Sequence, residues 1–151
     1  MRIAWRYIDK HKATINAIGD YGNQRAIINT TPEEIKAFFD KMATPTSSRL
    51  TGMPRSRNPH AAEEKMADGI DRLDLLRDRY ADAVDYMAWF EPAWGTLTDT
   101  EQTVLSEFYA SENLKSGACI RLQNKLSFGE AQIQRIRGKA LSRLITLLFG
   151  R

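Results

Sequence analysis

The residues with the clearest chemical potential lie near the carboxyl end, in the stretch "SFGEAQIQRIRGKALSRL". Basic side chains and glutamines gather there within a few helical turns: Gln132, Gln134, Arg135, Arg137, Lys139 and Arg143. Arginine and lysine can bind guanine edges in the DNA major groove, and glutamine can bind adenine edges. The composition of this stretch therefore predicts contact with double-stranded DNA.

Helical geometry divides these residues into two groups, because successive residues of an α-helix are about 100° apart. A helix that buries Ile133 and Ile136 turns its most polar side outward, which predicts base contacts by Gln132, Gln134, Arg135, Gly138 and Lys139. Donors at the edges are expected to hold phosphates: Lys115, Arg121, Lys125, Arg137, Ser142 and Arg143. Arg137 falls nearest the apolar side, so its stem is expected to follow the core. The alternative is a basic, solvated helix in an ordinary bundle.

Other residue types that could do chemistry are sparse. One cysteine, Cys119, excludes an internal disulfide, and with His11 and His60 it makes no zinc-ligand cluster. Five aspartates recur along one predicted helix: Asp71, Asp74, Asp78, Asp82 and Asp85. They could pair for metal binding or acid–base work, but a solvated acidic face explains them more simply. We therefore expect no catalytic residues, no metal, no cofactor and no enzymatic activity.

The charge distribution points to a polyanion. The 151 residues are 42% hydrophobic and 27% charged, enough for one modest core or two small lobes. Net charge is only +3, but residues 115–151 carry eight Lys or Arg against one acid, whereas residues 61–93 carry four against nine. No apolar run approaches the ~18 residues of a membrane helix, and the start is not built as a signal peptide. A cytoplasmic protein without membrane contact is expected.

Residues 1–43 are predicted to form an N-terminal helical segment with an interruption. Apolar spacing indicates a first helix that stops at Gly19, followed by a small hairpin or loop over residues 20–30. Thr31, Pro32 and Glu34 then resemble a capping box that opens a short amphipathic helix. Residues 44–60 are predicted to be a basic, mobile linker, either solvated or acting as a strap on nucleic acid.

Residues 61–92 are predicted to form one long amphipathic helix that is closed by Pro92 and Gly95. Its apolar stripe is predicted to contain seven residues: Met66, Ile70, Leu73, Leu76, Tyr80, Val84 and Met87. This stripe must be covered, either by the first helix of the same chain or by the same helix of a second copy in a homodimer.

Residues 95–151 are predicted to fold as three short helices with a tight turn between the last two, the helix-turn-helix plan. Thr98 with Glu101 is expected to cap the first helix. The second helix is expected over 116–126, burying Ile120 or Cys119 with Leu122 and Leu126. Ser127 with Glu130 is expected to cap the third, which buries Ile133, Ile136, Ala140, Leu144 and Leu147. The predicted fold class is all-α: a long amphipathic helix or helical hairpin, then a helix-turn-helix lobe.

The stretch "LTDTEQTVLSEFYASENLKSGACIRLQNKLSFGEAQIQRIRGKALSRL" resembles region four of bacterial sigma factors, which binds the minus-thirty-five promoter element and touches the polymerase flap. Over residues 44–148 the chain is similar to sigma-like proteins of phages and prophages, relatives of late-operon activators of the ArpU and RinA kind. Its most specific pieces are "LTGMP" and "IQRIRGKAL". The resemblance implies promoter DNA and RNA polymerase as partners.

The chain departs from the pattern of that family in four respects, one of which is the segment "YGNQRAIINTTPEEIKAFF", which has no counterpart there. Gln123 stands where a small residue is usual, and acidic Glu130 where a basic one is usual, so Glu130 either caps its helix or accepts a hydrogen bond from cytosine. The promoter-melting region is absent, which favours an activator over a complete sigma factor. Two functions are compatible with these features: a sequence-specific transcription regulator, or a packaging or structural adaptor like a small terminase subunit, which would form a ring.

Overall fold

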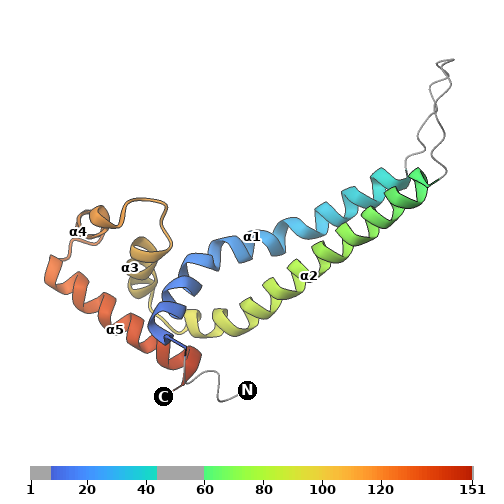
Figure 1. Cartoon of the computed structure of the whole chain (residues 1–151). Helices are drawn as coiled ribbons and strands as arrows, with labels where there is room; N and C mark the ends of the chain where they lie inside the picture. The colour runs from blue at the N-terminus through green and yellow to red at the C-terminus, as the bar shows by residue number, and fades with distance from the viewer. Residues whose placement is uncertain (1–7, 44–59, 151) are drawn as a thin grey trace. The chain divides into compact units, whose positions relative to one another are not determined.

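The computed structural model describes residues 8–43 and 60–150, and these residues are folded as helices without any strand (Figure 1). The elements are α1 (Lys10–Ala43), α2 (Ala61–Gly95), α3 (Asp99–Tyr109), the short 3-10 helix η2 (Lys115–Gly117), α4 (Ala118–Leu126) and α5 (Glu130–Phe149). The predicted all-α class is confirmed. Of the predicted linker 44–60, only His60 is among the described residues. No helix in the described part has both the length and the apolar character needed to cross a bilayer.

Contacts divide the chain into two compact units. The first joins Met1–Arg25 to Asp85–Arg151, and the second is Ala26–Val84. Both boundaries fall inside the long helices α1 and α2, whereas the sequence analysis placed its boundaries at the helix ends, near residues 43 and 95. The lobe expected at 95–151 is therefore part of a larger unit that includes the first part of α1 and the last part of α2.

Helix α1 is continuous, so the predicted stop at Gly19, the hairpin or loop over 20–30, and the new start at Thr31 are wrong. The helix begins after Asp9, whose side chain accepts a hydrogen bond from the Lys12 amide at 3.0 Å. Gly19 continues the helix, and a Cβ there would lie 3.3 Å from the Tyr109 carbonyl oxygen. A glycine at this position thus permits close packing in the first unit rather than ending the helix.

The second unit shows why Pro32 lies inside α1. A proline in a helix interior removes one backbone hydrogen bond and costs about 3 kcal/mol. Arg79 Nη2 donates to Thr31 Oγ1 at 3.2 Å and to Glu34 Oε2 at 3.0 Å, on either side of the proline. The Thr31 side chain is fully buried and is bound by α2 instead of capping a helix. Arg79 of α2 thus holds α1 on both sides of the proline.

In each long helix a series of buried or half-buried residues recurs at alternating steps of three and four, the period of a coiled-coil seam. On α1 they are Thr14, Ala17, Tyr21, Gln24, Ile28, Thr31, Ile35 and Phe38. On α2 they are Gly69, Leu73, Leu76, Tyr80, Ala83, Met87, Phe90 and Trp94. The predicted stripe shares four of these residues, but Met66, Ile70 and Val84 are exposed. The prediction missed Gly69 and Ala83, because small residues carry little apolar signal although they allow close approach.

Within the second unit, the last part of α1 and the first part of α2 pair as an antiparallel hairpin (Figure 1). A Cβ on Gly69 would lie 3.0 Å from Phe38 Cζ, so the glycine makes room for that ring. Arg79 meets Glu34 further along, which fixes the antiparallel direction. The hairpin form of the predicted fold is therefore observed, and α1 covers the seam of α2 in this unit.

In the first unit, α2 continues through Pro92 to Gly95, so Pro92 does not end it as predicted. An aromatic cluster forms where Phe90 stacks on Tyr86 and Trp94, with ring centroids 5.3 and 5.5 Å apart. Tyr21 of α1 lies against Phe90 at 5.4 Å. The Tyr86 hydroxyl donates to the Ala17 carbonyl, and burial raises the pKa of this phenol above its usual range, with smaller contributions from Asp20 and Tyr21. The two helices are thus joined by rings, by the partly buried Tyr86 hydrogen bond and by a bond from the Tyr21 hydroxyl to Glu91 Oε1 at 3.4 Å.

The carboxyl half of α5 completes the same core. Its buried residues are Ala140, Leu141, Leu144 and Leu148. The Trp89 indole donates to the Leu148 carbonyl at 3.4 Å, and the Trp89 ring meets Phe149 edge-on at 5.6 Å. Leu147, predicted to face inward, is 46% exposed, because helical drift brings Leu148 to the core instead. Half of α5 is therefore held by the long helices, which leaves the other half to the helix-turn-helix.

Candidate nucleic-acid interface

The amino-terminal half of α5 packs with α3 and α4 around a small core of their own. Five buried residues form it: Val104, Phe108, Ala118, Leu122 and Ile133. Helix α3 begins at a complete capping box, because Thr98 Oγ1 accepts from the Glu101 amide and the Glu101 carboxylate accepts from the Thr98 amide. That predicted cap is confirmed. On α4, Leu122 is buried as predicted. Of the two alternatives Ile120 and Cys119, Ile120 is 62% exposed, whereas Cys119 is partly buried and packs against this core beside the fully buried Ala118.

The turn between α4 and α5 has three residues, Ser127, Phe128 and Gly129. Ser127 adopts the left-handed conformation with φ 57°, and its amide donates to the Gln123 carbonyl, so Ser127 ends α4. The N-cap of α5 is Gly129, which has no side chain to accept a hydrogen bond. The predicted cap by Ser127 with Glu130 is wrong. Ser127 adopts the left-handed conformation in which helices commonly end, so it belongs to the end of α4 and not to the start of α5.

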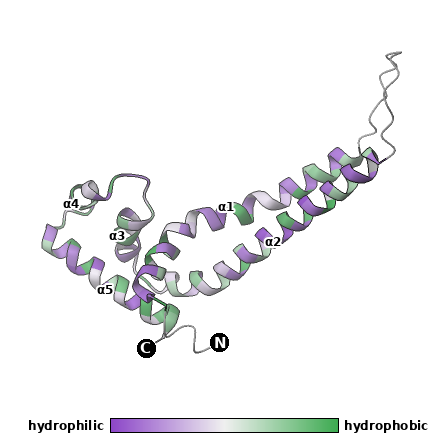
Figure 2. Ribbon diagram, viewed as in Figure 1, coloured by the Kyte–Doolittle hydropathy of each residue, from purple (hydrophilic) through white to green (hydrophobic). Residues whose placement is uncertain are grey.

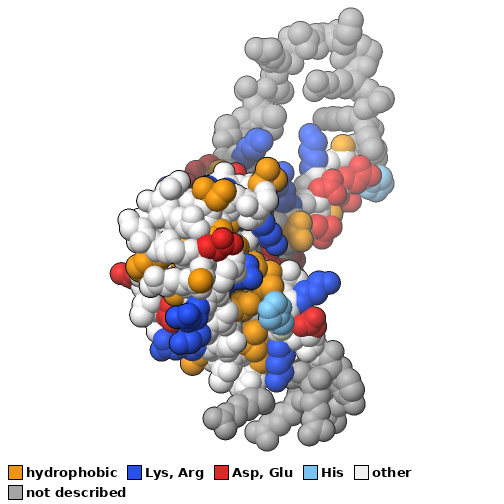
Figure 3. All heavy atoms as spheres, turned by 90° about the vertical axis from the view of Figure 1, so that its left-hand side faces the viewer, with side chains coloured by type: hydrophobic (Ala, Val, Ile, Leu, Met, Phe, Trp, Pro, Cys, Tyr) orange, Lys and Arg blue, Asp and Glu red, His pale blue; other side chains and the backbone are white. Residues whose placement is uncertain are grey.

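The outward face of α5 carries most of the predicted base-contacting residues. Gln132, Arg135, Gly138 and Lys139 are exposed, and Gln134 is half-buried. A Cβ on Gly138 would meet nothing within 4 Å, so the backbone there is open to close approach. Ser142 is exposed one turn further on. Figure 3 views the side of this unit that holds α4 and the start of α5, and its Lys and Arg side chains lie in separate groups with Asp and Glu among them.

Arg121, predicted to hold phosphate, is bound inside the lobe. Its Nε donates to the Glu107 carboxylate on α3, and its Nη2 donates to the Leu114 carbonyl at 3.0 Å. The Arg121 side chain is 34% exposed and that of Glu107 19%. A Cβ on Gly117 would lie 2.6 Å from Arg121 Nη1, so this glycine leaves space for the guanidinium. Arg121 therefore joins α3, the loop and α4.

Three other predicted phosphate ligands also have partners within the lobe. The Arg137 guanidinium carbon lies 4.6 Å from the centre of the Phe108 ring, so this half-buried residue follows the core as expected from its position. Arg143 Nη1 lies 3.6 Å from Glu101 Oε2, the carboxylate of the capping box. Lys115 Nζ lies 5.7 Å from the centre of the Tyr109 ring. Arg143 and Lys115 are exposed enough to exchange these contacts for phosphate.

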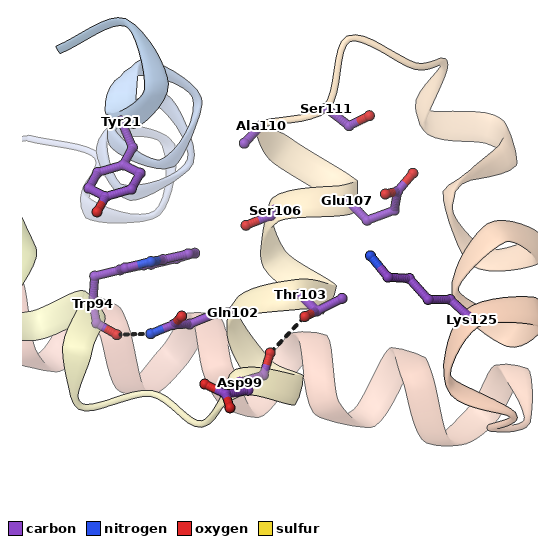
Figure 4. A pocket seen from close by; sticks show the side chains of 10 residues that line it. All are labelled: Tyr21, Trp94, Asp99, Gln102, Thr103, Ser106, Glu107, Ala110, Ser111 and Lys125. Atoms are coloured by element: carbon purple, nitrogen blue, oxygen red, sulfur yellow. Dashed lines mark hydrogen bonds between the residues drawn. The ribbon is translucent and has the colours of Figure 1, made fainter. Parts of the chain in front are cut away.

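Lys125 lies beside a cavity on the outer side of α3, and Figure 4 shows its side chain extending from α4 toward that helix. The cavity has a volume of about 550 Å³, and Tyr21 and Trp94 line its other end. The Gln102 amide is already bound to the Trp94 carbonyl at 2.9 Å. Among the described residues, no buried side-chain nitrogen or oxygen lacks a partner. The cavity therefore offers no unused buried donor or acceptor that would select a ligand.

Sequence reasoning missed the acidic and aromatic residues that hold the basic ones. Glu107 and Phe108 lie on α3, and they contact Arg121 on α4 and Arg137 on α5. No local spacing links residues on different helices, so only the packed structure pairs them. Within residues 8–43 and 60–150, no group of three or more His, Cys, Asp or Glu side chains is arranged to hold a metal ion.

Comparison of the chain with protein-family models, with curated proteins and with solved structures gives no match.

Proposed function

We propose that this chain is a sequence-specific regulator of transcription that binds double-stranded DNA with the amino-terminal half of α5 in the major groove. The observation that carries the proposal is the α4–turn–α5 unit, which leaves Gln132, Arg135 and Lys139 exposed on one face of α5. These side-chain types can bind adenine and guanine edges. A recognition helix must be held rigidly while its outward face is free, and the cores on both halves of α5 meet the first requirement.

The internal contacts refine which residues take which role. Arg121 supports the lobe, because its guanidinium donates hydrogen bonds to the Glu107 carboxylate and to the Leu114 carbonyl. Arg135 and Lys139 have exposed side chains on the outward face and are the favoured base-reading residues. Lys115 and Arg143 are at the edges and are assigned to phosphates. Activation at phage or prophage promoters, and contact with RNA polymerase, are part of the proposal and rest on the resemblance of residues 44–148 to sigma-like activators.

The test is salt-dependent binding by the full chain, with duplexes selected from a random pool and scrambled duplexes of the same composition. Arg135→Ala is expected to weaken binding to the selected duplex by about 10- to 100-fold, and to lose much of the preference over the scrambled one. Arg25→Ala is a matched control, because it removes the same exposed charge from α1. Equal loss in both variants, or no preference for any duplex by the unaltered protein, would refute groove reading by α5.

A further inference from the structure

One side of the hairpin in the second unit exposes apolar residues. Ile70 and Val84 on α2 are 52% and 40% exposed, and Phe39 on α1 is 48% exposed. Each directly follows a seam residue, namely Gly69, Ala83 or Phe38. In an antiparallel pair, the residues that follow the seam on both helices lie on the same side. Figure 2 shows hydrophobic residues among polar ones along both helices of this hairpin.

The opposite side of the hairpin has a different character. It is lined by Glu34, Ala37, Lys41 and Arg72, which directly precede seam positions, and the Arg79–Glu34 ion pair belongs to it. This side also carries one exposed apolar residue, Leu75, which directly precedes the seam residue Leu76. The polar side holds the Arg79–Glu34 ion pair, whereas the side with Phe39, Ile70 and Val84, here called the apolar side, has no cover among the described residues.

The core of this hairpin is small. Its buried residues are Thr31, Gly69, Leu76 and Ala83, and one of these is polar and one has no side chain. Two helices with so little buried apolar area are marginal in water, since most helical stability comes from packing of an amphipathic face. Additional burial at the apolar side would supply what the hairpin lacks.

We propose that the apolar side binds the same side of a second copy of the chain, so that two hairpins form a four-helix bundle. The evidence for a second copy is self-complementarity along α2. Asp74 and Arg77 both follow seam residues, are exposed, and form no ion pair within the described hairpin. Suppose that two α2 helices pack antiparallel, with a two-fold axis that passes between residues 75 and 76. Asp74 of each copy then lies opposite Arg77 of the other copy.

The same two-fold axis matches the apolar residues. It places Ile70 opposite Ala81, and Val84 opposite Ala67, so each branched side chain faces a small one. At about 1.5 Å per residue, residues 67–84 span roughly 26 Å, and a face two helices wide would bury on the order of 1,000 Å² in total. That area reaches the lower limit for a stable, specific interface. The inference is independent of the proposed DNA binding, although a two-fold dimer would present two copies of α5.

The test is the mass of the full chain in solution, measured by light scattering or sedimentation at micromolar concentrations. The unaltered protein is expected to be a dimer. Ile70→Glu is expected to weaken association by at least about 100-fold, since a two-fold interface contains the substitution twice. Leu75→Glu is the matched control: Leu75 is 68% exposed and lies on the far side of α2 from the seam, so the dimer should persist. Circular dichroism of both variants establishes that the helices remain.

A charge exchange tests the axis itself. Asp74→Arg alone should dissociate the dimer, because it places two arginines together in both contacts. Adding Arg77→Asp should restore association, because the pair is then reversed in both contacts. A monomeric unaltered protein, a ring of many copies, equal effects of Ile70→Glu and Leu75→Glu, or no rescue by the double exchange would each overturn the proposed interface.

Discussion

Arg121 gives the sharpest test of how the lobe uses its positive charge. If this residue supports α3 and α4 rather than contacting DNA, Arg121→Ala must lower stability and leave the electrostatics of DNA binding nearly unchanged. The substitution removes a charged hydrogen bond to Glu107 and a second bond to the Leu114 carbonyl. A hydrogen bond to a charged group contributes about 1.5–3 kcal/mol net, and the 34% exposure of Arg121 reduces this to about 1–2 kcal/mol.

For a chain of this size, that loss corresponds to a fall in Tm of about 3–6 °C. Calorimetry or thermal circular dichroism would measure it. A double-mutant cycle with Glu107→Gln should show coupling, with the double variant less destabilised than the sum of the two single ones. Gly117→Ala should also lower the Tm. A Cβ at this position would lie 2.6 Å from Arg121 Nη1, so the guanidinium would have to move away.

The DNA-binding assay supplies the second half of the test. The dependence of log K on log salt should change by less than about 0.3 in Arg121→Ala, whereas Lys115→Ala, at an exposed residue assigned to phosphate, should lower the slope by up to about 0.9, the value for one lost phosphate interaction. A variant at Arg121 with unchanged Tm and a slope reduced by about 0.9 would refute the supporting role and restore the original phosphate assignment.

Two further substitutions test the packing on which the interface depends. Leu122→Ala should destabilise the lobe by about 2–5 kcal/mol, because Leu122 is fully buried in the core beneath α5; urea unfolding with little loss of stability would show that this core does not hold the helix. Tyr86→Phe should cost about 1 kcal/mol, the net value of one buried hydrogen bond, while its ring stacking remains. Since folding raises the pKa of Tyr86, its contribution is complete below the unfolded pKa of about 10 and is lost as pH rises above that value. The difference in stability between the two proteins should therefore shrink on titration above pH 10, and a constant difference would contradict this account.

Short-range features of the sequence predicted the local structure well. The capping box of Thr98 and Glu101 formed as expected, because both partners lie within one helical turn. The end of α4 at Leu126 and the burial of Leu122 and Ile133 were also predicted correctly from periodicity. The same reasoning turned Arg135, Gly138 and Lys139 outward, and they are exposed. Of the two glutamines expected at the flanks, Gln132 is exposed and Gln134 is half-buried.

Predictions from local sequence were wrong for α1, where residues that usually break or cap a helix make contacts with distant parts of the chain. Gly19 and Pro32 usually interrupt helices, yet α1 continues through both. Gly19 permits close approach to the Tyr109 carbonyl, and Arg79 bridges residues on either side of Pro32. The capping motif at Thr31 was misleading for the same reason, because the hydroxyl that could cap a helix is bound by Arg79 of α2.

The sequence by itself determined an all-helical chain, a helix-turn-helix at its carboxyl end and a polar outward face on the last helix, because period and capping act over a few residues. Only the tertiary structure decided which face of each long helix is buried and which charges are free. Met66, Ile70 and Val84 form a convincing stripe in sequence, but the seam uses Gly69 and Ala83, whose small size lets α1 approach. Likewise Arg121 and Arg135 are equivalent as sequence letters, and the position of Glu107 on a neighbouring helix makes one a structural residue and leaves the other exposed.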